Sequence, residues 1–122
     1  MTKKKILVAD DDPAIVDVLQ ILLEDQGYEV LSTLNAEGIE ALVQKKPDMV
    51  LLDIWMSGVN GKDICIRIKA NENTKHIPVV MFSANRDTKE IAMECGADGF
   101  ITKPFEINEL IELIQKFTDN KS

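Results

Sequence analysis

Apolar and polar positions along this chain follow two patterns that alternate from one end to the other. Continuous apolar runs occur at residues 6–9, 49–52 and 78–82, residues 100–102 form a shorter segment, and residues 28–34 alternate more. Continuous runs are typical of strands buried on both faces, whereas alternation is typical of a strand with one exposed face. Between these segments, apolar residues recur every three or four positions, as in amphipathic helices. The pattern predicts five strands, each followed by a helix.

Residues that start or stop helices mark the ends of the five predicted helices. The first helix begins near Pro13, which suits a first helical turn, and stops at Gly27. Asn35 is the expected N-cap of the second helix, and Pro47 follows its end. The fourth helix is more polar and spans roughly Thr88–Cys95. The other four have apolar faces formed by Ile15, Val16, Leu19, Leu22 and Leu23; by Ile39, Leu42 and Val43; by Ile64, Cys65 and Ile68; and by Ile107, Leu110, Ile111, Ile114 and Phe117.

The alternation of strands and helices predicts an α/β fold with a parallel sheet covered on both faces. The first, third and fourth strands are the most continuously apolar, so we expect them in the middle of the sheet and the second and fifth at its edges. This ranking fits the doubly wound, flavodoxin-like order 2-1-3-4-5. The topological switch point of that order lies between the first and third strands, beside Asp10, Asp11 and Asp53.

Length and composition limit the class of protein. The 122 residues predict one domain, residues 1–122, and the polar end at 118–122 predicts no following output domain. No apolar stretch is long enough to span a membrane or serve as a signal peptide, so we expect a cytoplasmic protein. The net charge of −7 argues against direct binding of nucleic acid. Cys65 and Cys95 are isolated in sequence and are expected to be reduced core thiols.

The ends of the predicted strands carry the candidate chemistry. Parallel strands direct their carboxyl ends to one edge of the sheet, which gathers Asp10, Asp11, Asp53, Ser83 and Lys103 there. Carboxylates so close together repel one another unless a cation intervenes, and Mg²⁺ prefers such oxygen ligands. A magnesium ion, a carboxylate, a hydroxyl and a lysine together suit phosphoryl transfer, in which an aspartate can accept the phosphoryl group as an acyl phosphate.

Four segments resemble the receiver domains of two-component and phosphorelay response regulators, in particular chemotaxis-type single-domain receivers. The resemblance covers essentially the whole chain, and the four segments in this order and spacing are highly specific. They are Ile6-Leu7-Val8-Ala9-Asp10-Asp11-Asp12-Pro13, Pro47-Asp48-Met49-Val50-Leu51-Leu52-Asp53, Pro78-Val79-Val80-Met81-Phe82-Ser83-Ala84 and Gly96-Ala97-Asp98-Gly99-Phe100-Ile101-Thr102-Lys103-Pro104-Phe105.

The resemblance implies a role for the acidic residues. Asp53 is similar to the phosphoacceptor, which takes phosphate from a histidine kinase, a phosphotransfer protein or a small phosphodonor. Asp10 and Asp11 resemble the acidic pair that holds Mg²⁺ or Mn²⁺ together with Asp53 and the backbone carbonyl of Trp55. The chain would then catalyse only its own phosphorylation and dephosphorylation and would not be a metabolic enzyme.

The resemblance also implies how the phosphorylated state is sensed. Ser83 resembles the hydroxyl that bonds the phosphoryl group, and Lys103 the lysine that pairs with it, followed by Pro104 in the usual cis position. Phe100 matches the aromatic switch residue. The readout face would consist of the fourth helix, fifth strand and fifth helix, where a downstream protein or output domain binds. Such receivers are monomers or weak dimers that depend on phosphorylation.

Three residues depart from the family pattern. Ser57 stands where proline is usual after the acceptor loop. Phe100 lacks the hydroxyl of the commoner tyrosine, and its ring can be either buried or exposed. Trp55 is unusually large for its position two residues after Asp53. We hypothesise that the Trp55 side chain shields the acyl phosphate from water and slows its hydrolysis.

Three other functions compete with a phosphorylated switch. A receiver-like interaction module that is never phosphorylated would usually lack one of the site residues, all of which are present. A phosphatase of the haloacid-dehalogenase type needs a second aspartate two residues after the nucleophile, where this chain has Trp55. A flavodoxin-like FMN binder needs a phosphate-binding loop after the first strand, where this chain has three aspartates.

Overall fold

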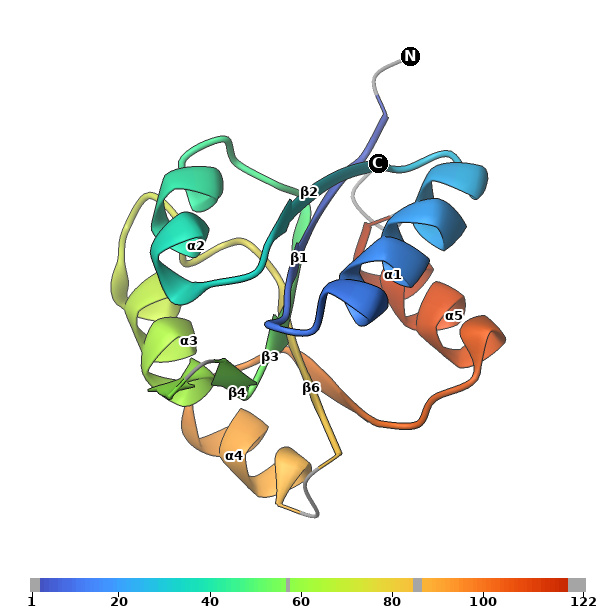
Figure 1. The fold of residues 1–122 in the computed structure, drawn as a ribbon. Coiled ribbons are helices and arrows are strands. Elements are labelled where there is room, and N and C mark those ends of the chain that lie inside the picture. Colours follow the sequence, from blue (N-terminus) through green and yellow to red (C-terminus); the bar gives the residue numbers. More distant parts are fainter. Residues whose placement is uncertain (1–2, 57, 85–86, 119–122) are drawn as a thin grey trace.

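The five strands of the main sheet alternate with five helices in the computed structural model, as the sequence predicts (Figure 1). The structure describes residues 3–56, 58–84 and 87–118. In chain order the elements are β1 (Lys5–Ala9), α1 (Pro13–Asp25), β2 (Glu29–Thr33), α2 (Ala36–Val43), β3 (Met49–Asp53), β4 (Trp55–Met56), β5 (Val59–Asn60), α3 (Gly61–Ala70), β6 (Val79–Ser83), α4 (Thr88–Glu94), β7 (Gly99–Thr102) and α5 (Ile107–Thr118).

The main sheet is parallel and has the order β2-β1-β3-β6-β7. Counting only its five strands along the chain, this is the predicted order 2-1-3-4-5, and the α/β fold class is confirmed. Every residue of β3 and β6 is buried, whereas the edge strand β2 is partly exposed throughout. The length of the apolar runs therefore ranked the strands correctly from centre to edge.

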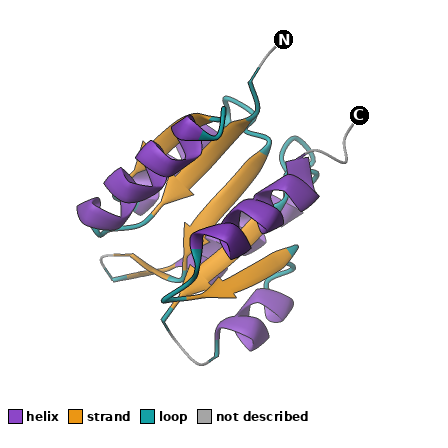
Figure 2. Ribbon diagram, turned by 90° about the vertical axis from the view of Figure 1, so that its right-hand side faces the viewer, coloured by secondary structure: helices purple, strands orange, loops and turns teal. Residues whose placement is uncertain are grey.

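The helices form one layer on each face of the sheet (Figure 2). Alternate strand residues point to opposite faces, so Leu7 and Ile6 enter different core clusters. One cluster packs α2, α3 and α4 against the sheet, and the other packs α1 and α5 against its opposite face. Among the described residues, no helix combines the length and apolar character needed to cross a membrane.

Polar caps fix where the helices begin beside the carboxyl ends of the strands. The Asp12 carboxylate accepts a hydrogen bond from the Ala14 backbone N–H at 3.0 Å, and the Asn35 side chain accepts one from the Gly38 N–H at 2.8 Å. Asn35 is thus the N-cap expected from the sequence. Each cap satisfies an amide that has no partner within the first helical turn.

A small antiparallel hairpin of β4 and β5 follows β3, where the sequence predicts only a loop. Strands of two residues carry no hydrophobic periodicity, so this hairpin has no sequence signal of the kind that revealed the main sheet. It leads directly into α3, whose first residue, Gly61, packs against the end of β3. A Cβ atom on Gly61 would lie 2.3 Å from the backbone oxygen of Asp53.

Candidate functional site

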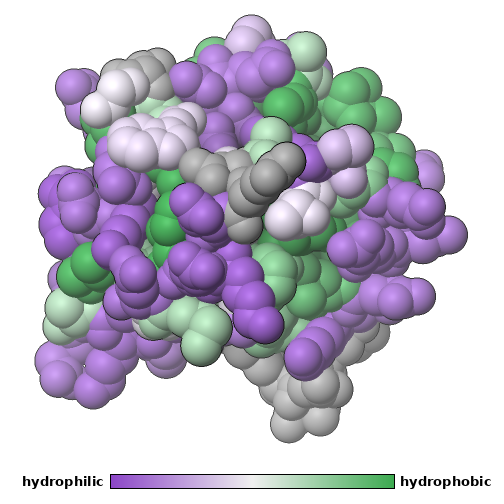
Figure 3. Space-filling model, turned by 90° about the horizontal axis from the view of Figure 1, so that it is seen from below, coloured by the Kyte–Doolittle hydropathy of each residue, from purple (hydrophilic) through white to green (hydrophobic). Residues whose placement is uncertain are grey.

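The carboxyl edge of the sheet brings together the polar residues predicted to meet there. Asp10 follows β1, Asp53 ends β3, Ser83 ends β6 and Lys103 follows β7. Asp10, Asp53 and Ser83 are buried, and Asp11 is exposed. Figure 3 views the molecule from below Figure 1, the end towards which the strands run, and hydrophilic residues cover much of that face.

Three carboxylates form a compact acidic cluster at this edge. One oxygen from each of Asp10, Asp11 and Asp53 lies within 4.8 Å of the others. The backbone N–H of Asp12 donates to Asp10 Oδ1 at 2.9 Å, which holds that carboxylate in place at the entrance to α1. Hard oxygen ligands at this spacing fit a divalent cation such as Mg²⁺, which commonly binds through few carboxylates and keeps other positions for water and phosphate.

Lys103 reaches the acidic cluster from the loop after β7. Its Nζ atom lies 2.8 Å from Asp10 Oδ2 and 3.8 Å from Asp53 Oδ1. The same ammonium lies 4.6 Å from the centre of the Phe82 ring, and the Lys103 backbone N–H donates to the Ser83 carbonyl at 2.8 Å. These contacts hold the lysine over the end of the sheet. The Lys103–Pro104 peptide bond is cis, as the resemblance implied.

The environment of Asp53 makes its negative charge unfavourable. Burial is the largest cause, and the neighbouring charge of Asp10 adds to it. Lys103 and a hydrogen bond from the Trp55 backbone act in the opposite direction. Together these effects raise the pKa of Asp53 to about 6, so a bound cation that offsets the neighbouring negative charges would favour the ionised carboxylate.

The two predicted switch residues lie on neighbouring strands. Ser83 is the buried last residue of β6 and pairs in register with Thr102 of β7. Phe100 of β7 pairs with Met81, and its side chain is 40% exposed. Of the two ring positions that the sequence left open, this structure has the exposed one. The role of either residue as a switch stays a prediction.

Trp55 is placed beside the site by the hairpin. Its side chain is 52% exposed, whereas the next residue, Met56, is fully buried. The binding of a metal ion by the Trp55 carbonyl and the shielding of an acyl phosphate by its ring both remain predictions. Ser57, the third departure from the family pattern, lies outside the described residues.

Among the hollows outside the acidic cluster, the two that flank α1 and α2 were not anticipated from the sequence. One, of about 510 Å³, lies between α1 and the segment after β7 and is almost wholly apolar. It is lined by Ala14, Ile15, Val18, Leu19, Ala84, Lys103, Pro104, Phe105 and Ile107, and therefore reaches the site lysine. Apolar surface is visible in Figure 3 on the right, the side on which α1 and α5 lie in Figure 1. We name this hollow the α1 groove.

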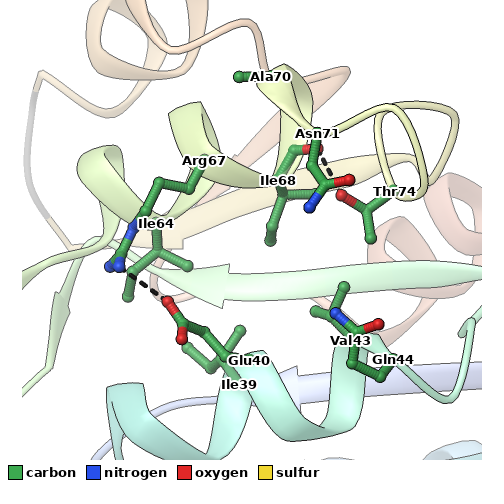
Figure 4. A pocket seen from close by; sticks show the side chains of 10 residues that line it. All are labelled: Ile39, Glu40, Val43, Gln44, Ile64, Arg67, Ile68, Ala70, Asn71 and Thr74. Carbon is green, nitrogen blue, oxygen red and sulfur yellow. Dashed lines mark hydrogen bonds and ion pairs between the residues drawn. The ribbon is translucent and has the colours of Figure 1, made fainter.

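The second hollow, of about 450 Å³, lies between α2 and α3 (Figure 4). Its floor is formed by buried side chains such as Ile39 and Ile64, and the ion pair between Glu40 and Arg67, at 2.7 Å, crosses its mouth. Its lining includes neither Lys103 nor any of the three aspartates of the acidic cluster, so it is separate from the candidate site.

Comparison with known proteins gives one family. The model of the response regulator receiver domain matches residues 6–115. The phosphate regulon transcriptional regulatory protein PhoB of Pseudomonas aeruginosa is 40% identical over 114 residues, which cover 91% of this chain and 50% of PhoB. The DNA-binding response regulator MtrA of Mycobacterium tuberculosis H37Rv is 35% identical over 118 residues, covering 93% and 50%. The chain spans about half the length of these relatives.

Solved structures agree with the sequence comparison. A putative response regulator from Chloroflexus aurantiacus has a TM-score of 0.89 and 26% identity, covering 97% of this chain and 99% of that one. The receiver domain of the sensor histidine kinase PA1611 from P. aeruginosa has a TM-score of 0.83 and 25% identity, with the same coverage. In that structure a magnesium ion is coordinated in the active site cleft.

Proposed function

Because the chain belongs to the response regulator receiver domain family, we propose that it receives a phosphoryl group on Asp53 and switches the surface that a partner recognises. A receiver domain is a signalling phosphoacceptor rather than a metabolic enzyme. The observation that carries the proposal is the position of Asp53, buried between Asp10 and the ammonium of Lys103.

The reaction makes limited demands on the protein. A carboxylate oxygen of Asp53 attacks the phosphorus atom of the donor, and the bond from phosphorus to the donor nitrogen or oxygen breaks with the electron pair leaving on the donor. When bound by Asp10, Asp11, Asp53 and the Trp55 carbonyl, Mg²⁺ supplies charge neutralisation at the phosphoryl oxygens. Lys103 then pairs with one of these oxygens, and the Ser83 hydroxyl donates to another.

Phosphorylation changes the contacts that Lys103 and Ser83 make, and these residues follow β7 and end β6. A phosphoryl group that binds one of two conformations better shifts the population toward it. The readout face is α4, β7 and α5, where Phe100 is exposed, and a downstream protein or output domain recognises it there. Association in the phosphorylated state is at most a weak dimer. A cytoplasmic location is part of this proposal.

The phosphodonor is a histidine kinase or a phosphotransfer protein that docks in the α1 groove. This groove is apolar, carries the half-exposed Val18 and ends at Lys103. A protein surface seated there lies next to the acceptor, which favours a donor that presents a phosphohistidine beside an apolar helix face. Small donors such as acetyl phosphate need no such contact.

Intact mass measurement after incubation with acetyl phosphate tests the acceptor. We expect the parent chain to gain one phosphoryl group in the presence of Mg²⁺ and none in its absence. Asp53→Asn should gain none under either condition. Because the chain has other aspartates at the same edge, Asp12→Asn is the matched control, and it should gain the group as the parent does.

The result that contradicts the proposal is equally direct. A parent chain that binds Mg²⁺ but gains no phosphoryl group from acetyl phosphate or phosphoramidate would support the interaction-module function instead. An adduct that persists in Asp53→Asn would assign the chemistry to a different residue.

A further inference from the structure

Two cysteines lie together in the core, away from the acidic cluster. Cys65 is in α3 and Cys95 directly follows α4, on the same face of the sheet (Figure 1). Both are free thiols, 0% and 3% exposed, as expected from the sequence. The Cys65 thiol donates to the backbone carbonyl of Cys95 with 3.4 Å between sulfur and oxygen. The side chain from one helix therefore touches the backbone at the end of the other.

Two ion pairs bracket this contact. Lys62 Nζ lies 2.5 Å from Glu94 Oε2, and Lys69 Nζ lies 2.6 Å from Asp98 Oδ2. Residues 62, 65 and 69 occupy one face of α3, because positions three and four apart share a face. Their partners at 94, 95 and 98 are almost consecutive. Three successive contacts thus hold one face of α3 against the end of α4 and the turn after it, with the Cys65 thiol on the backbone of Cys95.

The two sulfurs differ in acidity. The neighbouring cysteine is the largest cause of each shift: Cys95, with burial adding to the rise, raises the pKa of Cys65, and Cys65 lowers the pKa of Cys95 to about 7. In the folded chain the Cys95 thiol donates to the Ala92 carbonyl with 3.4 Å between sulfur and oxygen. The ammonium of Lys62 also favours the Cys95 thiolate. The thiolate is the form that reacts with oxidants. Cys95 also lies at the end of α4, where a local opening can expose it, whereas Cys65 lies within α3. We therefore take Cys95 as the nucleophile of the pair and Cys65 as the resolving thiol.

We propose that Cys65 and Cys95 are a site of reversible oxidation by hydrogen peroxide, at which an intramolecular disulfide joins α3 to the end of α4. The Cys95 thiolate attacks one peroxide oxygen, the O–O bond breaks, and after protonation the products are a sulfenic acid and water. The Cys65 sulfur then attacks the Cys95 sulfur, the S–O bond breaks and a second water leaves. Two thiols and one peroxide give one disulfide and two waters.

Access to the pair requires only a local opening. Cys95 follows a helix of seven residues and precedes Gly96, whose φ of +78° ends that helix. Short terminal segments open at a lower free-energy cost than the global core. Once formed, the disulfide would restrain α4, one element of the proposed readout face. The oxidation itself does not depend on phosphorylation of Asp53, so the two proposals succeed or fail separately.

The test is oxidation of the full reduced chain by hydrogen peroxide with EDTA and no phosphodonor. After denaturation and alkylation with N-ethylmaleimide, the reduced chain should carry two alkyl groups. The oxidised chain should carry none, weigh two hydrogens less than the unalkylated reduced chain, and yield a non-reduced peptide that links residues 65 and 95. Dithiothreitol should restore both alkylations. Hydrogen exchange of the α4 amides should be slower in the oxidised chain.

Single variants and an unfolded control distinguish oxidation of a cysteine pair that the fold positions from random oxidation of thiols. The chain has two cysteines, so Cys65→Ser and Cys95→Ser each leave one. Cys65→Ser should react with peroxide faster than Cys95→Ser, since it retains Cys95 at the end of α4, where the ammonium of Lys62 also favours the thiolate. Disulfide formation should be faster in the folded parent than in guanidinium chloride.

Several outcomes would overturn the proposal. These are complete alkylation of the peroxide-treated parent, oxygen addition without a cross-link, disulfides only between chains, or faster closure in the unfolded chain. Unchanged exchange of the α4 amides in a cross-linked protein would overturn the restraint on α4. Whether the disulfide forms is measured on the parent chain itself. The proposal can therefore be overturned even where a variant fails to fold.

Discussion

Asp53 shows at the scale of one residue how a binding site is made at the expense of stability. Its pKa of about 6 lies above the usual value of 3.8, because burial and Asp10 oppose its charge. An acid whose pKa is raised in the folded state destabilises the fold when it ionises. The cost is absent below the unfolded value, near pH 4, and is fully present above about pH 6.

Asp53→Asn should therefore stabilise the chain in the absence of divalent ions, and only at the higher pH. We expect the free energy of unfolding to rise by about 2–3 kcal/mol near pH 8, and the gain to disappear as the pH falls toward 4. Urea unfolding of both proteins in EDTA at several pH values measures the difference. Asp17→Asn on the exposed side of α1 should change little at any pH. A gain that is independent of pH would contradict the effect of charge burial.

Trp55→Ala tests whether the large residue after the acceptor protects the acyl phosphate. The Trp55 side chain is half exposed beside the end of β3, and its removal should let water reach the phosphoryl group more readily. We expect the phosphorylated variant to lose phosphate several-fold faster than the parent when the donor is removed. Intact mass over time measures the loss. Val59→Ala, on the paired strand β5, is the control and should hydrolyse at the parent rate.

At the scale of single elements, the turn from β3 into α3 is set by close backbone packing at Gly61. A Cβ there would lie 2.3 Å from the Asp53 carbonyl oxygen and 3.0 Å from the Ile54 carbonyl oxygen, and both are backbone atoms rather than the ends of flexible side chains. Gly61→Ala should therefore displace the end of β3. We expect a loss of about 2–4 kcal/mol in unfolding free energy, typical of overpacking and backbone strain, together with slower phosphorylation by acetyl phosphate.

Gly58→Ala is the comparison for Gly61→Ala. Gly58 has a φ of +83° but nothing within 4 Å of an added Cβ, so we expect only the cost of about 1 kcal/mol for a left-handed residue. Equal effects of the two substitutions in urea unfolding would show that the contact with β3 is unimportant.

The elements also show which part of the fold the sequence could predict. Strands β1, β3 and β6 are continuous apolar runs, and their ends place Asp10, Asp53 and Ser83 at one edge by topology alone. The β4–β5 hairpin and the packing of Gly61 carry no such periodicity. They depend on contacts between backbone atoms, which a pattern of apolar and polar residues does not record.

For the whole molecule, the sheet order separates three surfaces around one site. The acidic cluster lies at the carboxyl edge, the α1 groove adjoins it through Lys103, and α4 lies on the opposite face of the sheet from α1. The sequence predicted the cluster because its members are polar residues at strand ends. It did not predict the groove, because Val18 lies outside the predicted apolar face of α1, whereas Ile107 was assigned to the apolar face of α5. That both are exposed at one groove follows only from the packing of the helices.

The α1 groove leads to the last prediction, which separates protein donors from small ones. The Val18 side chain is 53% exposed in the parent chain and lines the groove. Val18→Glu therefore places a negative charge in the groove without altering a residue of the acidic cluster. We expect phosphotransfer from a histidine kinase that phosphorylates the parent chain to slow by tenfold or more, since burying an unpaired carboxylate costs more than about 1 kcal/mol. Phosphorylation by acetyl phosphate should keep its parent rate.

Met93→Glu is the matched control for Val18→Glu, because it adds the same charge at an apolar residue that is 71% exposed on α4. It should leave both reactions unchanged, since α4 lies on the other face of the sheet from α1. If both variants slow the kinase equally, the added charge acts at long range and the groove is not the docking site. If Val18→Glu also slows acetyl phosphate, it disturbs Lys103 rather than a protein contact. Only a selective loss with the kinase assigns the groove to the donor.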